Sequence, residues 1–218
     1  MTVIVGITDG DKVYMGSDSL ISGENEIQSL NTPKIIKKEC IQDCGMIDET
    51  DTIIIGVSGT LRGLQLLQYQ WNPPVQSQDQ TDDEYIHVSV LNSIHTLFIE
   101  YGAGLMIENQ DQHPDNFLIG YKGRLYILDP NYQLFEVTKP YIAIGSGAAY
   151  ALGSLNTNHN KIKSHPLFCI ENAVGAAIEF CPTCGGEIKI YEVGAEGTLV
   201  PDYQESKIPS VCQQPQDA

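Results

Sequence analysis

The chain begins Met1-Thr2-Val3-Ile4-Val5-Gly6-Ile7, a short run of β-branched residues. Such a run predicts a buried strand that starts at the end of the chain. Chain ends are poorly ordered unless something ties them down. If Met1 is removed, Thr2 carries a free α-amine beside its own hydroxyl, and that amine can accept the hydroxyl proton and activate the oxygen. Thr2 is therefore either an ordinary strand residue or a nucleophile.

The alternating pattern of a strand continues beyond this run. Residues 3–7 and 12–17 predict a hairpin closed by the turn signal Asp9-Gly10-Asp11. Further strands are predicted at residues 33–37, 52–58, 116–121, 124–128, 133–137, 141–144 and 187–193. Helices are predicted at residues 60–69, 81–101, 145–155 and 170–180. This order predicts an α+β fold, a four-layer αββα sandwich of two stacked, mainly antiparallel sheets flanked by helices.

Composition limits the class of protein. The 218 residues, 42% of them hydrophobic, suffice for one domain with a substantial core. The formal net charge of −16 argues against a nucleic-acid partner, because phosphate contacts require clustered Lys and Arg. No apolar run approaches the ~20 residues that cross a bilayer, and no secretory signal is recognisable. We expect a cytoplasmic protein without membrane contact, with a single domain at 1–205, an acidic loop at 39–51 and a polar tail at 206–218.

Six cysteines stand at positions 40, 44, 169, 181, 184 and 212. Without a secretory route we expect most of them to be reduced thiols. A tetrahedral zinc site formed by Cys181, Cys184, Cys40 and Cys44 is an alternative, although the spacing of the pair at 40 and 44 is not a standard one. Zinc and a disulfide both stay open on the sequence.

Nine short segments follow one another in a characteristic order. They are Thr2-Val3-Ile4-Val5-Gly6, Gly16-Ser17-Asp18-Ser19, Lys34-Ile35, Gly56-Val57-Ser58-Gly59-Thr60, Gly120-Tyr121, Leu125-Tyr126-Ile127-Leu128-Asp129-Pro130, Ile142-Ala143-Ile144-Gly145-Ser146-Gly147, Tyr150-Ala151-Leu152-Gly153 and Cys184-Gly185-Gly186. In this order the chain resembles a proteasome β-type subunit and, in its N-terminus, the bacterial HslV peptidase. Both belong to the N-terminal-nucleophile (Ntn) hydrolases. The resemblance extends from Thr2 to about Val193.

The resemblance implies an active site around Thr2. Asp18 follows Thr2 by sixteen residues and Lys34 by thirty-two, which are the family's spacings. By resemblance Thr2 is the nucleophile, Lys34 lowers the pKa of its amine and hydroxyl, and Asp18 holds Lys34 charged. Gly59 matches the oxyanion-hole glycine, and Ser146 matches the serine near the threonine amine. Taken singly, each residue also fits a structural role, such as a hairpin end, a surface charge, a turn or a helix N-cap.

Three features concern specificity and departures from the family. Val57 falls where the family lines its primary specificity pocket, which implies a modest apolar pocket; packing in the core is the alternative. The stretch from Lys34 to Gly59 is longer than the family norm. Residues 181–186 replace the proteasome pattern Asp-x-x-Ser-Gly-Gly, so the roles of that Asp and Ser are open. The HslV type binds a monovalent cation here, and by resemblance Na⁺ would bind the carbonyls of Ile178, Cys181 and Cys184, with no other cofactor required.

A second motif points to another class of enzyme. His113-Pro114-Asp115-Asn116-Phe117-Leu118-Ile119, followed by Leu128-Asp129-Pro130, is similar to the catalytic loop of small-molecule kinases. A kinase also needs a glycine-rich phosphate loop and a strand lysine paired with a helix glutamate, and neither is convincing here. We interpret His113 as a loop histidine and Asp129-Pro130 as a turn.

The resemblance as a whole implies a threonine endopeptidase that cleaves unfolded polypeptide after Met1 is removed. It further implies a homo-oligomeric ring or double ring fed by a separate ATP-dependent unfoldase, and the sequence has no ATPase motif of its own. Two alternatives stay open: a ring subunit without activity, and an amidohydrolase of the same superfamily that acts on a small amide. Retention of Met1 would favour the inactive subunit, because it blocks the amine.

Overall fold

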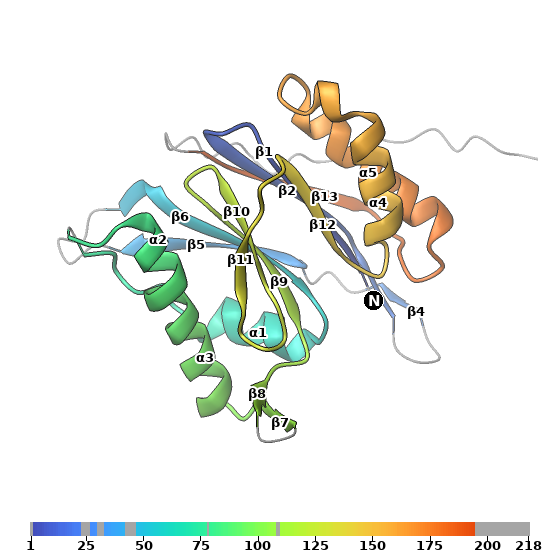
Figure 1. Ribbon diagram of the computed structural model, residues 1–218. Helices are drawn as coiled ribbons and strands as arrows, with labels where there is room; N and C mark the ends of the chain where they lie inside the picture. Colours follow the sequence, from blue (N-terminus) through green and yellow to red (C-terminus); the bar gives the residue numbers. More distant parts are fainter. Residues whose placement is uncertain are drawn as a thin grey trace, which may run out of the picture.

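The structure, a computed structural model, describes residues 2–22, 27–29, 33–41, 47–77, 79–107 and 110–194. Two antiparallel sheets stack on one another in the middle of the molecule, and helices cover both outer faces (Figure 1). The predicted α+β sandwich of two mainly antiparallel sheets flanked by helices is therefore confirmed. The expected tail at 206–218 and the domain end at 205 lie outside the described residues.

The first sheet contains the N-terminal strand, and its strand order is β12-β1-β2-β13. Its members are β1 (Val3–Thr8), β2 (Lys12–Asp18), β12 (Tyr141–Gly145) and β13 (Ile188–Gly194). β1 is an interior strand, in which Ile4 pairs with Ser17 on one side and with Ile144 on the other. The hairpin predicted over residues 3–17 is confirmed. Pairing on both sides fixes the beginning of the chain in the sheet.

The second sheet has the strand order β11-β10-β9-β6-β5. Its members are β5 (Ile35–Ile41), β6 (Ile47–Ser58), β9 (Asn116–Tyr121), β10 (Arg124–Leu128) and β11 (Leu134–Glu136). Two short hairpins lie outside these sheets and pair β3 (Leu20–Ser22) with β4 (Ile27–Ser29) and β7 (Leu105–Ile107) with β8 (Gln110–Gln112).

The acidic segment 39–51 differs from the expected loop. Residues 39–41 belong to β5 and residues 47–51 to β6, and Ile41 pairs with Ile47. Asp and Glu disfavour strands, but a strand partner and neighbouring β-branched residues override that preference. Residues 42–46 lie outside the described part of the chain.

The helices form the two outer layers. The second sheet is covered by α1 (Leu61–Tyr69) and by a continuous helical segment of α2 (Asp82–Glu84), the π-helix Tyr85–Val90 and α3 (Leu91–Glu100). The first sheet is covered by α4 (Ala148–Thr157) and α5 (Pro166–Phe180), joined by the 3-10 turn His159–Lys161. The described helices include none that is both long and apolar enough to cross a membrane.

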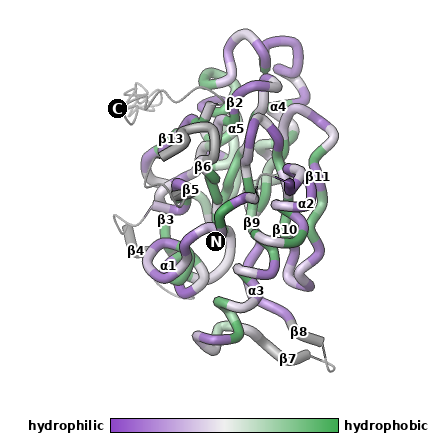
Figure 2. Tube along the Cα trace, turned by 90° about the vertical axis from the view of Figure 1, so that its left-hand side faces the viewer, coloured by the Kyte–Doolittle hydropathy of each residue, from purple (hydrophilic) through white to green (hydrophobic). Residues whose placement is uncertain are grey.

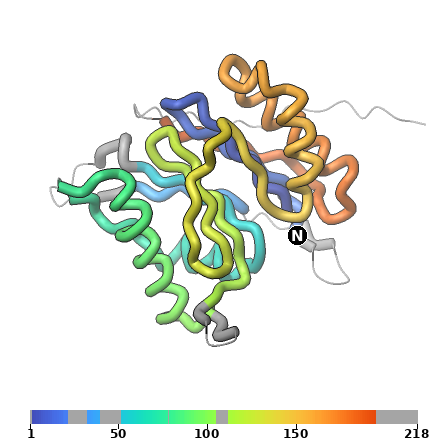
Figure 3. Tube along the Cα trace, viewed as in Figure 1, coloured from blue at the N-terminus to red at the C-terminus, as the bar shows by residue number. Residues whose placement is uncertain are grey.

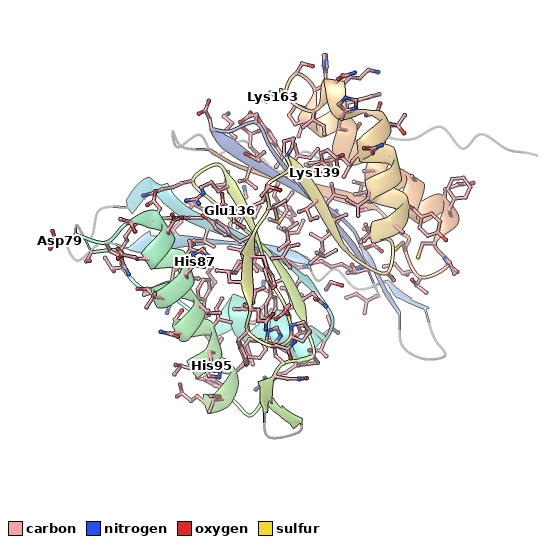
Figure 4. All side chains as sticks on the ribbon, viewed as in Figure 1. Asp79, His87, His95, Glu136, Lys139 and Lys163 are labelled. Atoms are coloured by element: carbon pink, nitrogen blue, oxygen red, sulfur yellow. The ribbon has the colours of Figure 1, made fainter. Side chains whose placement is uncertain are left out.

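Three hydrophobic layers hold the sandwich together. One lies under α4 and α5, one under α1 and α3, and the third lies between the sheets, where Ile4, Met15 and Leu118 are fully buried. In Figure 2 the central strands contain many hydrophobic residues, drawn in green, and Figure 4 shows side chains filling the space between the layers. Glycines bring the sheets close together: a Cβ on Gly56 would lie 2.5 Å from Ile4 Cγ2, and a Cβ on Gly120 would lie 2.6 Å from Val13 Cγ1. The start of β1 is thereby packed against the second sheet.

Candidate active site

Thr2 lies immediately before β1 and is 4% exposed. Its backbone nitrogen donates to Ser146 Oγ at 3.2 Å, and its carbonyl oxygen accepts from Ser146 Oγ at 3.2 Å and from the Gly147 amide at 3.3 Å. Figure 3 shows this end of the chain beside the turn that leads from β12 into α4. Gly145 in that turn has φ +93°, and a Cβ there would come within 2.3 Å of the Thr2 carbonyl oxygen. The β12–α4 turn therefore fixes the backbone of Thr2.

Asp18, the last residue of β2, is the centre of the hydrogen-bond cluster and is fully buried. Its Oδ1 accepts from Thr2 Oγ1 at 2.9 Å and from Lys34 Nζ at 2.7 Å. The Val3 amide also donates to Oδ1 at 3.0 Å, and the Gly185 amide donates to Oδ2 at 3.1 Å. Because both carboxylate oxygens are satisfied, Asp18 holds the hydroxyl and the ammonium in a fixed arrangement.

Lys34 comes from the other sheet, just before β5, and is 6% exposed. Its carbonyl accepts from the Val57 amide at 2.9 Å, so the pairing with β6 sets its position. Burial lowers the pKa of the Lys34 ammonium, and the charge of Asp18 opposes that shift. The site thus contains a buried cation that shares one carboxylate oxygen with the Thr2 hydroxyl.

Gly59 lies in the turn between β6 and α1, with φ +154°. A Cβ at this position would lie 2.2 Å from Asp115 Oδ1, so the turn requires glycine. The turn begins beside Thr2: a Cβ built on Gly145 would lie 2.3 Å from the Thr2 carbonyl oxygen and 2.9 Å from Ser58 Oγ. Ser58, the residue before Gly59, therefore lies beside the Thr2 backbone.

Thr183 is a site residue that sequence reasoning missed. Its hydroxyl lies 2.8 Å from Ser146 Oγ and 3.2 Å from Cys181 Sγ. The resemblance predicts functional groups at Cys181 and Cys184. The hydroxyl that contacts Ser146 belongs instead to Thr183, between them. A hydrogen-bonded chain therefore runs from the Thr2 nitrogen through Ser146 to Thr183.

The cysteines near the site are free thiols. Cys181 and Cys184 are both 6% exposed, and with Cys169 they are unpaired within the described chain. Burial raises the pKa of the Cys184 thiol to about 12. At Cys181 burial acts in the same direction, but hydrogen bonds with Thr183, Cys184 and Ser146 together outweigh it and lower the pKa. The described residues contain no cluster of three or more His, Cys, Asp or Glu that would hold a metal ion. Cys44, a member of the alternative zinc site, lies outside them.

Two further predicted positions lie near the cluster. Val57 is 5% exposed and belongs to the core between the second sheet and α1 and α3. Its predicted role in a specificity pocket stays a prediction. The carbonyl of Cys181, one of the predicted cation ligands, accepts the Cys184 amide at 3.0 Å. A carbonyl oxygen has a second lone pair, so the turn is compatible with a hard cation.

No protein-family model matches the sequence, and no curated protein matches it significantly. Solved structures do match. A structure of Thiobacillus denitrificans BPH in complex with epoxomicin is 17% identical, with a TM-score of 0.68, and the match covers 89% of this chain and 100% of that one. HslV from Trypanosoma brucei is 13% identical, with a TM-score of 0.59 and coverages of 88% and 99%. The helical assembly of the Anbu complex from Pseudomonas aeruginosa is 15% identical, with a TM-score of 0.61, and the match covers 88% of this chain and 81% of that one.

The chain has the proteasome-type Ntn-hydrolase fold. Within this Ntn-hydrolase fold, four of the predicted catalytic residues, Thr2, Asp18, Lys34 and Ser146, meet in one hydrogen-bonded cluster from distant parts of the sequence. The fifth, Gly59, lies in the adjacent turn. The kinase-like segment at residues 113–119 leads into β9 of the Ntn-hydrolase sandwich.

Proposed function

We propose that this chain is a threonine peptidase that uses Thr2 as its nucleophile once Met1 has been removed. The observation that carries the proposal is the sharing of Asp18 Oδ1 by the Thr2 hydroxyl, at 2.9 Å, and the Lys34 ammonium, at 2.7 Å. Burying a lysine and an aspartate is costly. A threonine with a purely structural role in a strand would not need such a pair beside its hydroxyl.

The reaction follows from the groups present. Removal of Met1 turns the Thr2 nitrogen into an α-amine, with an ordinary pKa of about 8, which accepts the hydroxyl proton as Oγ1 attacks the scissile carbonyl. The positive charge of Lys34 favours the deprotonated forms of both groups. The protonated amine then gives its proton to the leaving amine, and an acyl-enzyme ester remains on Oγ1. Water, deprotonated by the same amine, hydrolyses that ester and regenerates the hydroxyl.

Two groups assist this chemistry. The N–H of Gly59 would donate to the oxyanion of the tetrahedral intermediate, which is the most effective place for a fixed hydrogen-bond donor. Ser146 accepts from the Thr2 nitrogen at 3.2 Å and is itself in contact with Thr183, so it orients the lone pair of the amine.

The wider expectations are also proposals. The Anbu neighbour forms a helical assembly, which supports an oligomer of this chain; the ring or double ring, the unfoldase and the unfolded polypeptide substrate rest on the sequence resemblance. The same holds for a cytoplasmic location and for Na⁺ at the carbonyls of Ile178, Cys181 and Cys184, with no other cofactor. An apolar cleavage preference would follow if Val57 contributes to the pocket.

The decisive experiment starts from a fusion whose cleavage leaves Thr2 as the first residue. Mass spectrometry confirms the new N-terminus, and a panel of fluorogenic peptides and small amides is then assayed. We expect peptide hydrolysis by the Thr2 form, some retained activity in Thr2→Ser, and none in Thr2→Ala or in the chain that keeps Met1. Turnover of small amides alone would support the amidohydrolase, and no turnover by a correctly processed, assembled protein would support an inactive ring subunit.

A further inference from the structure

Asp115 is a fully buried carboxylate outside the cluster around Thr2. It stands just before β9, and none of the salt bridges among the described residues involves it. Burial raises the pKa of this carboxyl, because a buried negative charge without a countercharge is costly. The hydrogen bonds of the Asp115 carboxylate show what offsets the cost of its burial.

The carboxylate binds the beginning of α1. Asp115 Oδ1 accepts the backbone N–H of Thr60, and Oδ2 accepts the Thr60 hydroxyl at 3.3 Å. Thr60 is the N-cap of α1, and its Oγ1 accepts the Gly63 amide at 3.2 Å. A negative charge is favourable there, because unpaired N–H groups and the helix dipole make the N-terminus electropositive. Asp115 thus fixes the residue that follows Gly59.

Two glycines make room for this carboxylate. A Cβ on Gly59 would lie 2.2 Å from Asp115 Oδ1, and a Cβ on Gly63 would lie 2.0 Å from Oδ2. Gly63 lies inside a helix, where glycine costs about 0.5–1 kcal/mol relative to alanine. The turn and the first turn of α1 are therefore both shaped around the two oxygens of Asp115.

An aromatic cluster packs around His113, which accepts a hydrogen bond from the Asp115 backbone. The Asp115 amide donates to His113 Nδ1 at 3.4 Å, and the His113 ring stacks on Phe117 with centroids 4.9 Å apart. Tyr132 lies edge-on to His113 at 4.6 Å and contacts His95 of α3, labelled in Figure 4, at 4.3 Å. Ring packing on several sides limits the movement of the backbone at Asp115.

We propose that Asp115 is a positioning residue for the peptidase reaction, because it holds the Gly59–Thr60 turn with the Gly59 N–H directed at the carbonyl that Thr2 attacks. This inference rests on the proposed function. The turn begins at Ser58, which lies beside the Thr2 carbonyl, so a shift of the turn changes the place of the oxyanion donor. A donor stabilises the oxyanion only when it is already in position, so a small displacement lowers the rate.

Three variants and one control test the proposal in the form that begins with Thr2. Asp115→Ala removes both acceptors. Asp115→Asn keeps an acceptor for the Thr60 amide and should rescue part of the loss. Gly63→Ala keeps the carboxylate but displaces it, and its higher helix propensity favours folding. The control is Asp9→Ala: Asp9 also accepts backbone amides, those of Asp11 and Lys12, but in the turn at the far end of β1.

The readout compares two reactions of Thr2. Hydrolysis of a fluorogenic peptide amide requires an oxyanion, whereas addition of Thr2 to a tri-leucine vinyl sulfone forms no tetrahedral carbonyl intermediate. We expect kcat for hydrolysis to fall roughly 10- to 100-fold in Asp115→Ala and Gly63→Ala, and less in Asp115→Asn. KM and the vinyl sulfone labelling rate should change less than about twofold, and Asp9→Ala should resemble wild type.

The outcomes separate this inference from the proposed function. If the wild-type Thr2 form neither hydrolyses peptides nor reacts with the vinyl sulfone, the proposed function fails and the role of Asp115 fails with it. If wild type does both, the role of Asp115 is overturned by unchanged kcat in the folded variants. It is equally overturned if hydrolysis and labelling fall by the same factor, because that indicates general damage to the site. Should Asp115→Ala not fold, Asp115→Asn and Gly63→Ala decide.

Discussion

Lys34 Nζ lies 2.7 Å from Asp18 Oδ1, and the two side chains are 6% and 0% exposed. The pair connects the two sheets, because Asp18 ends β2 in the first sheet and Lys34 precedes β5 in the second. In this low-dielectric position each charge requires the other. The same contact that supports the proposed chemistry at Thr2 therefore also contributes to the association of the sheets.

Removing one member of this pair is expected to be costly. Lys34→Met leaves the Asp18 carboxylate buried without its cation, and Asp18→Asn leaves the ammonium, so each should destabilise the fold by about 3–5 kcal/mol. The double variant should lose much less than the sum of the two, while all three variants lose peptidase activity. Urea unfolding of the four proteins measures the coupling. If the losses in free energy of unfolding of the two single variants simply add up in the double variant, Lys34 and Asp18 do not interact directly.

Thr183→Val should lower activity without affecting the fold. It removes the hydroxyl that lies 2.8 Å from Ser146 Oγ, and so frees Ser146 to turn away from the Thr2 nitrogen. The loss of one such hydrogen bond is worth about 1 kcal/mol, or a roughly three- to tenfold fall in kcat. Thr157→Val is the matched control, because its hydroxyl bonds only the Gly153 carbonyl among the contacts described for it, at 3.0 Å near the end of α4. Equal kcat in both variants would remove Thr183 from the site.

His113 should make the fold sensitive to acid. Burial lowers the pKa of His113 from the ordinary 6.5 to about 4, against the opposing contacts with Asp129 and Asp115. Between those pH values the unfolded chain takes up a proton that the folded chain does not, so stability falls as the pH falls from about 6.5 towards 4.

His113→Asn keeps an acceptor near the position of Nδ1 and removes this titration. The variant should lose less stability than wild type between pH 7 and 4.5, as measured by urea midpoints at each pH. Asp115, whose pKa is raised by burial, contributes in the opposite sense, but it does so in both proteins. His159→Asn on the exposed 3-10 turn is the control. Parallel pH curves for wild type and His113→Asn would rule out this source of acid sensitivity.

Gly16 and Ile170 are expected to be coupled in stability. A Cβ on Gly16 of β2 would lie 2.1 Å from Ile170 Cγ2 of α5, so Gly16→Ala should displace the helix and cost about 1–3 kcal/mol. Ile170→Ala alone should cost about 2–5 kcal/mol, because it leaves a cavity. In the double variant the new methyl group occupies part of that cavity, so the total should be less than the sum. Thermal or urea unfolding tests this, and an additive result would contradict the contact.

The sequence by itself determined the sandwich and the centre of the candidate site. Alternation in residues 3–17 specifies the first hairpin, and its register, Ile4 opposite Ser17, brings Thr2 and Asp18 together as a local consequence of strand pairing. The position of Lys34 also followed from sequence, through its spacing in the resemblance.

Only the tertiary structure decided what the residues far apart in the chain do. Asp115 reaches Thr60 across 55 positions, and Thr183 reaches Ser146 across 37, because stacked sheets and packed turns bring these segments together. The alternation of side chains within a segment carries no information about such contacts. A carboxylate in a loop resembling a kinase motif is thus placed at the turn beside Thr2, where the amide and hydroxyl of Thr60 offset part of the cost of burying it.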